Sequence, residues 1–91
     1  MKYMLNWKIP PENHQSVARK FLESGAPMPE GVTLIGRWHA PGSVSGWALI
    51  ETDNPAAIHE HVTRWASMLV STCTPVVEDA QAAESIKMIY G

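Results

Sequence analysis

The sequence predicts an α+β fold of the ferredoxin-like type, with the element order β-α-β-β-α-β and a C-terminal helix. Two observations lead to this prediction. Short runs rich in β-branched and aromatic residues alternate with segments whose apolar residues recur at helical spacing. Proline, glycine and asparagine stand between these segments and mark turns. At 91 residues, the chain is expected to form one domain spanning residues 1–91.

The first half of the chain predicts a strand, a helix and a second strand. Residues 2–9 are rich in Tyr, Trp and Ile and end at two prolines, a run too short for a helix. Apolar side chains then recur at helical spacing over residues 17–22, and Gly25 stands where a C-terminal cap belongs. Residues 32–39 have the composition of the second strand.

The second half predicts a hairpin, a helix, a strand and a last helix. The turn-rich residues 41–46 connect the second strand to a third at 47–52. The segment Asp53-Asn54-Pro55 supplies a helix cap followed by Pro at the first helical position. The following apolar face is expected to carry Ile58, Val62, Trp65 and Leu69.

The segment from residue 72 predicts an edge strand and a packed helix. Residues 72–77 are mostly β-branched, and Pro75 favours an edge or a bulge. Asp79 is expected to cap a helix that ends near residue 89. Its inner face would use Ala83, Ile86 and either Ile89 or Tyr90.

Strand alternation predicts apolar side chains on both faces of the sheet. In the first strand Leu5, Trp7 and Ile9 share one face and Met4 lies on the other. In the second strand Leu34 and Trp38 share a face opposite to that of Ile35. In the third strand Trp47 and Leu49 lie on one face, and Ala48 and Ile50 lie on the other. Two helices can cover only one face, and a bare apolar face is an aggregation hazard. We therefore expect a homodimer that forms through the sheet face.

Composition excludes several classes of protein. Seven Lys and Arg against nine Asp and Glu give a net charge of −2, which lacks the basic surface that nucleic acid binding requires. No long apolar run suggests a membrane span, and the first residues do not form a signal peptide, so a cytoplasmic location is expected. The single Cys73 cannot form an internal disulfide or a zinc site, and we expect a small buried hydrophobe.

The end of the second strand is the first candidate site. Arg37 and His39 share one face of the strand, and Trp38 faces the other. An imidazole with a pKa of about 6.5 can accept a proton, and a guanidinium can hold an anionic ligand through its planar fork. Alternatively, the two side chains stabilise a dimer face or the turn that follows.

Two polar residues interrupt the other strands. Glu51 shares the parity of Trp47 and Leu49, where burial would raise its pKa toward that of a base, or where it would pair with an arginine or a helix N-terminus. Asn6 can donate and accept hydrogen bonds and so could orient a ligand.

Four tryptophans are many for a chain of this length. They are core residues if they pack on one another. If the helices leave a space above the sheet, the tryptophans line an apolar cleft with Asn6, His39 or Glu51 at its rim. The four are Trp7, Trp38, Trp47 and Trp65.

The remaining histidines give no metal signature. His59 and His61 lie two apart, so they point to nearly opposite sides of a helix and cannot chelate one ion. A solvated helix face accounts for them, and His14 is expected to be exposed. No metal site and no cofactor are predicted.

Several segments resemble a family of short proteins known only as a domain of unknown function. They are GRWHAPG at 36–42, GWALIETDNP at 46–55, TPVVED at 74–79, the opening MKYMLNWKIPPEN and FLESGAPMPEGV at 21–32. That family is similar in fold to the dimeric α+β barrel proteins, in which two ferredoxin-like sheets pack face to face. Such proteins include cofactor-free monooxygenases, muconolactone-isomerase-like enzymes and haem-degrading monooxygenases, so the likeness leaves the function open.

The resemblance to haem-degrading barrels is partial. It would carry over to Asn6 and Trp65, but those enzymes also use a haem-ligating histidine downstream of the tryptophan, and none follows Trp65 here. His61 lies one turn earlier instead, and haem binding remains a minor alternative.

Taken together, the sequence predicts a homodimer that binds a small hydrophobic or aromatic molecule between sheet and helices. Monooxygenase- or isomerase-like chemistry would use His39 as base, Arg37 as anion clamp and Asn6 as orienting group. The alternative is a non-catalytic binding or regulatory module.

Overall fold

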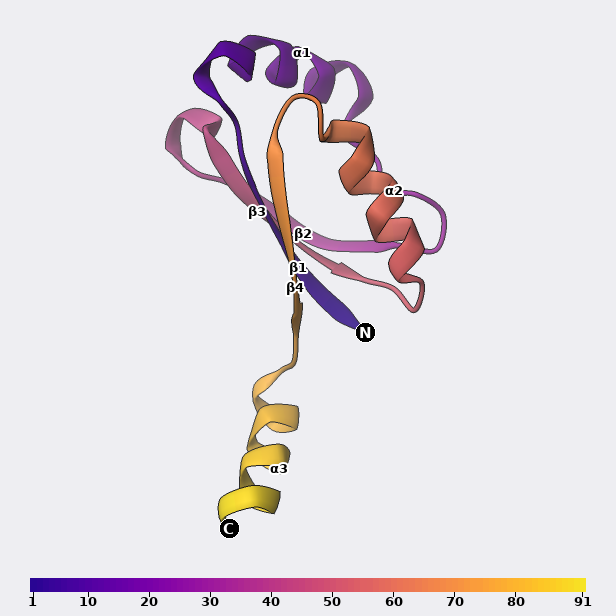
Figure 1. Ribbon diagram of the computed structural model, residues 1–91, viewed down its shortest axis with the longest axis vertical. Helices are drawn as coiled ribbons and strands as arrows, with labels where there is room; N and C mark the ends of the chain where they lie inside the picture. Colours follow the sequence, from indigo (N-terminus) through magenta and orange to yellow (C-terminus); the bar gives the residue numbers. More distant parts are fainter.

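The computed structural model describes all residues, 1–91, as a four-stranded antiparallel sheet with three helices (Figure 1). The order of strands in the sheet is β2-β3-β1-β4, which is the ferredoxin-like arrangement predicted above. The strands are β1 (Lys2–Lys8), β2 (Thr33–His39), β3 (Ser45–Glu51) and β4 (Val70–Val76). β4 lies at an edge, which accommodates Pro75 as expected.

The capping residues predicted from the sequence set the end of the first helix and the start of the second. A 3-10 turn (Pro11–Asn13) leads into α1 (His14–Ser24), which ends at Gly25 with a left-handed φ of 72°. The Asn54 side-chain oxygen accepts a hydrogen bond of 3.2 Å from the Ala56 N–H and so caps α2 (Pro55–Trp65). The second helix ends at Trp65, so the expectation that its apolar face extends to Leu69 is wrong, although Leu69 is buried just beyond the helix.

Both helices pack on the same face of the sheet. In the first of two buried clusters, Ile58 of α2 packs on Leu5 and Ile50 of the sheet. In the second, Val17 of α1 meets Trp65 of α2. Trp7 packs against both clusters, so its face of β1 is the one that the helices cover.

A β-bulge in β2 changes the predicted alternation of that strand. Leu34 lies opposite Ile50, whereas Trp38 lies opposite Trp47, with the register shift between Leu34 and Gly36. The expectation that Leu34 and Trp38 share a face is therefore wrong, because the extra residue of the bulge reverses the alternation between them.

The face of the sheet away from the helices is apolar and open. Trp38 and Trp47 are paired across β2 and β3 and are 55% and 42% exposed. Met4 and Leu49 are paired beside them, across β1 and β3. This confirms that apolar side chains occupy both faces of the sheet.

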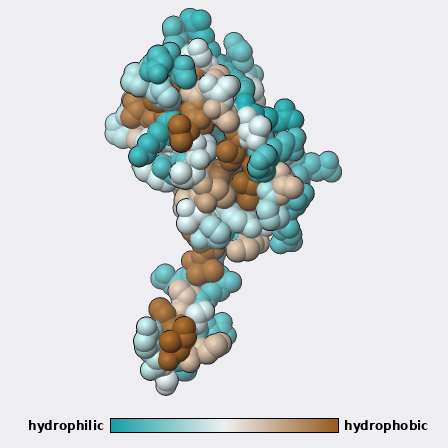
Figure 2. Space-filling model, viewed as in Figure 1, coloured by the Kyte–Doolittle hydropathy of each residue, from teal (hydrophilic) through white to brown (hydrophobic).

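The C-terminal helix departs from the sequence prediction. α3 (Asp79–Tyr90) is capped by Glu78, which forms a capping box with Gln81, and not by Asp79. The helix projects away from the sheet (Figure 1). Figure 2 shows hydrophobic residues on its surface. Ile86 and Ile89 are 58% and 73% exposed, so the expected inward packing is wrong for the single chain. The helix follows an edge strand that leads away from α1 and α2.

Cys73 is also placed differently from the expectation. It is exposed in β4, although it lies opposite the buried Leu5. As an edge strand, β4 is largely uncovered, and only Ser71 and Val76 along it are partly buried.

Candidate functional site

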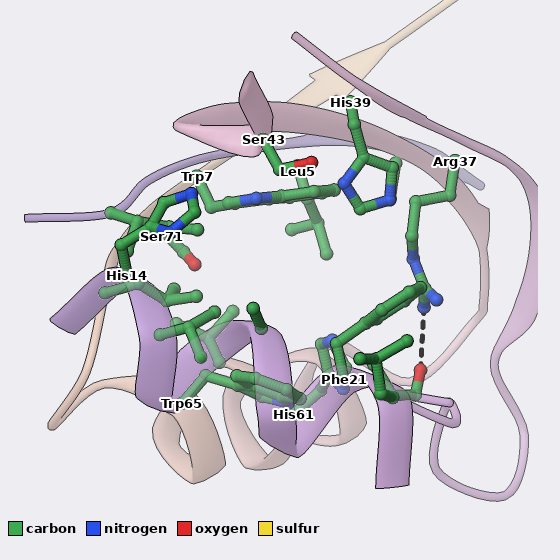
Figure 3. Close-up of a pocket in the computed structure, with 18 of the residues that line it drawn as sticks. Leu5, Trp7, His14, Phe21, Arg37, His39, Ser43, His61, Trp65 and Ser71 are labelled. Atoms are coloured by element: carbon green, nitrogen blue, oxygen red, sulfur yellow. Dashed lines mark hydrogen bonds between the residues drawn. The ribbon is translucent and has the colours of Figure 1, made fainter. Parts of the chain in front are cut away.

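A cavity of about 380 Å³ lies between the sheet and the two helices that cover it (Figure 3). Thirteen of its nineteen lining residues are hydrophobic. Most of these hydrophobic residues come from β1 and the two helices, for example Leu5 and Trp7 from β1, Phe21 from α1, and Val62 and Trp65 from α2. The volume lies within the range of roughly 300–1,000 Å³ that is typical of small-molecule sites.

His39 reaches the cavity from the end of β2 and is held between two aromatic rings. Its imidazole lies edge-on to the indole of Trp7, with ring centroids 5.7 Å apart and an angle of 75° between planes. The Phe21 ring of α1 lies on the other side at 5.3 Å and 67°. Both are favourable edge-to-face arrangements, so the imidazole is oriented by β1 and α1 together.

Arg37 enters the cavity two residues earlier on the same face of β2 (Figure 3). Its guanidinium donates hydrogen bonds of 3.2 Å to the Gly25 carbonyl and 2.7 Å to the Ala26 carbonyl. It also lies 5.8 Å from the centroid of the Phe21 ring. Partial burial lowers the pKa of Arg37, and its position is fixed by the end of α1.

Two further histidines line the cavity, although the sequence predicts that both lie in solvent. His61 projects from α2 into the cavity. Burial lowers its pKa most, and the positive charges of Arg37 and Arg64 lower it further. His14 lies in the first turn of α1, where its Nε2 is 2.8 Å from the Gly42 carbonyl oxygen.

A sequence signal for these two residues exists. His61 lies four residues before Trp65, on the same face of α2, and His14 lies three residues before the buried Val17 of α1. His59 is exposed on α2 while His61 faces the cavity, which confirms that the two point in different directions.

Four of the predicted site residues come together and four do not. Arg37, His39, Trp7 and Trp65 line the cavity. The expectation of one cleft lined by all of them is corrected, because Asn6, Trp38, Trp47 and Glu51 alternate with the cavity-facing residues of their strands and lie on the open face.

Two of these polar residues have structural surroundings of their own. The Asn6 Nδ2 donates a hydrogen bond of 2.9 Å to the Gly46 carbonyl of the neighbouring strand. Glu51 is exposed at the end of β3, opposite Lys2 and Thr33.

The residues named for the haem resemblance do not surround one space. Trp65 lines the cavity, whereas Asn6 lies on the opposite side of the sheet and bonds to Gly46. The pair therefore does not fit around a single haem.

No group of three or more His, Cys, Asp or Glu side chains could hold a metal ion. No helix is long and apolar enough to cross a membrane.

Comparison with known proteins assigns the chain to a family. Residues 1–89 match the family described as Domain of unknown function (DUF3303). The chain belongs to the DUF3303 family. No curated protein matches this DUF3303 chain.

Solved structures similar to the DUF3303 chain share its fold. One is a provisionally assigned antibiotic biosynthesis monooxygenase from Deinococcus radiodurans, with 13% identity and a TM-score of 0.51 over 86% of this chain and 94% of that one. Another is Rv0793 from Mycobacterium tuberculosis, with 10% identity and a TM-score of 0.50 over 87% and 97% of the two chains. At these identities the likeness shows the fold alone.

The lowered pKa of His61 predicts an acid-sensitive stability. A histidine in an unfolded chain has a pKa of about 6.5, whereas the pKa of His61 is lowered in the folded state. Below that pH the unfolded state binds a proton at His61 more readily than the folded state does, so the free energy of unfolding decreases as the pH is lowered. Above that pH both states are neutral and the effect vanishes. We expect His61→Gln to lose less stability than the wild type between pH 7.5 and 5, in urea unfolding.

The matched control for this prediction is His59→Gln, on the exposed side of the same helix. It should keep the pH dependence of the wild type. Equal acid sensitivity of His61→Gln and the wild type would contradict the prediction.

Proposed function

We propose that this DUF3303 chain binds a small hydrophobic or aromatic molecule in the cavity between the sheet and the helices. The observation that supports the proposal most is the composition of the cavity, an apolar space of about 380 Å³ on which a few polar side chains converge. This is the usual constitution of a small-molecule site. Trp7 and Phe21 offer aromatic rings for contact with a flat ligand.

Proton transfer is the chemistry that the polar side chains support. His39 is oriented by Trp7 and Phe21 and could accept a proton from a bound ligand, while Arg37 would stabilise the negative charge that forms. Such a step begins both isomerase-like and monooxygenase-like reactions, and the assignment of the Deinococcus radiodurans protein is compatible with it.

The alternative is a binding or regulatory module that uses the same cavity without turnover. The two functions differ in what His39→Ala removes once a ligand has been captured and identified by native mass spectrometry. Loss of its conversion with binding retained supports an enzyme. A change in affinity alone, without any conversion by the wild type, supports the binding module.

Filling the cavity should weaken the binding of a neutral apolar probe. Val62 of α2 lines the cavity, and Val62→Phe would place a ring in that space. We expect the affinity for N-phenyl-1-naphthylamine, followed by its fluorescence, to fall about tenfold or more, a loss of about 1.4 kcal/mol. Val44→Phe, at an exposed residue outside the cavity, is the matched control. Equal affinity for the two variants would contradict the proposal.

We also propose that two copies associate through the open face of the sheet. Trp38 and Trp47 expose large apolar rings there, and water contact with such a patch is unfavourable. The projecting α3 adds exposed Ile86 and Ile89. A helix of 12 residues that buries none of its side chains has marginal stability in water, so a partner surface would stabilise it.

A charge on the open face should separate the copies. We expect the wild type to be a dimer and Trp47→Lys a monomer in size-exclusion chromatography with light scattering, because burial of a lone ammonium is costly. Val44→Lys, at an exposed residue of the turn before β3, should remain a dimer. Circular dichroism checks that each variant is folded, and a monomeric wild type would contradict the proposal.

A further inference from the structure

The polar side chains of the cavity share one chemical property. No Asp, Glu, Asn or Gln is among its nineteen lining residues. The polar lining consists of one guanidinium, three imidazoles and two hydroxyls, namely Arg37, His14, His39, His61, Ser43 and Ser71. All of them can donate a hydrogen bond, and the only permanent charge among them is positive. The cavity is therefore suited to a group that accepts hydrogen bonds and carries a negative charge.

Arg37 lacks a negative partner within the chain. The three ion pairs of the structure join the N-terminus to Asp53, Lys2 to Glu78 and Arg64 to Glu60, and none includes Arg37. Its hydrogen bonds go to two neutral carbonyl groups. A half-buried cation without a counter-ion is costly, and an anion that enters the cavity would remove that cost.

We propose that the ligand is an apolar molecule with a single acidic oxygen group, and that it binds as its monoanion against Arg37. This inference rests on the proposed function and specifies the class of ligand. The apolar part would lie against Trp7 and Phe21, and the oxyanion would accept hydrogen bonds from the guanidinium and a neighbouring imidazole. A carboxylate and the anion of an aromatic hydroxyl share this chemistry.

The surroundings of His61 support the same arrangement. Burial and the positive charge of Arg37 favour its neutral form, in which one ring nitrogen donates and the other accepts. The charged or titratable groups around it are Arg37 from β2, Arg64 from its own helix, and the cavity histidines His14 and His39. An anion bound beside Arg37 would offset that positive charge and raise the pKa of His61.

Matched ligands test the proposal on the full-length chain. The probes are 2-naphthoate, its neutral analogue 2-naphthamide, and 2-naphthol, with affinities from isothermal titration calorimetry. We expect at least one of the two acids to bind as its anion, about tenfold or more tightly than naphthamide. A red-shifted absorption of bound naphthol shows that it is bound as the anion. Whichever of the two acids binds as an anion identifies the acidic group.

Substitutions at two arginines assign the preference to the cavity. Arg37→Met should reduce the preference for the anion to less than about twofold. Arg37→Lys, which keeps the charge and loses the planar fork, should retain part of it and covers the case in which Arg37→Met does not fold. Arg19→Met, at an exposed residue of α1 outside the cavity, should leave the preference unchanged.

A spectroscopic readout separates charge recognition from packing. In an NMR titration of the His61 ring protons, the anionic probe should raise the pKa of His61 and naphthamide should not. Equal affinities for naphthoate and naphthamide, with naphthol bound in its neutral form, would overturn this inference and leave the proposed function intact. Absence of binding by all three probes and by N-phenyl-1-naphthylamine would overturn both.

Discussion

The close contact between Trp7 and Gly46 is the constraint on which the cavity depends. The two residues lie opposite each other on β1 and β3. A Cβ atom on Gly46 would collide with the indole of Trp7 and would approach the Trp38 carbonyl oxygen to 2.6 Å. The missing side chain therefore lets the indole lie against the backbone of β3. Any larger residue would push the ring toward the helices and into the cavity.

A continuous set of contacts then runs from the sheet to α1. Trp7 contacts His39, His39 contacts Phe21, and Arg37 lies beside Phe21 while it donates to the carbonyls at the end of the helix. The residues that orient the imidazole thus also help to hold α1 on the sheet, together with the buried Val17. The side chains that stabilise the fold here are also the ones that fix the polar groups of the cavity in place.

The sequence was sufficient for what depends on local chemistry. The strands, Gly25 as the C-terminal cap of α1 and the cap of α2 were all predicted, because each follows from a few neighbouring residues. The placement of Trp38 and Trp47 was not, since alternation separates the two faces of a strand but does not say which face meets the helices. His61 was missed because its spacing from Trp65 places it on one face of α2 but does not say that this face meets a cavity. For α3 the sequence predicted the helix correctly but not its packing, because nothing in the local sequence shows whether a helix lies against the sheet.

The two faces of the sheet meet at one backbone position. On the helix side the Trp7 indole lies against Gly46, and the Gly46 carbonyl accepts a hydrogen bond from Asn6, which itself lies on the open face. The strand that supports the cavity floor is therefore also held by a residue that alternates away from the cavity. Because every strand has a period of two, cavity and open face are built from interleaved residues of the same strands. The cavity takes all of its polar groups from one chain, so a second copy on the open face would stabilise the sheet without completing the site.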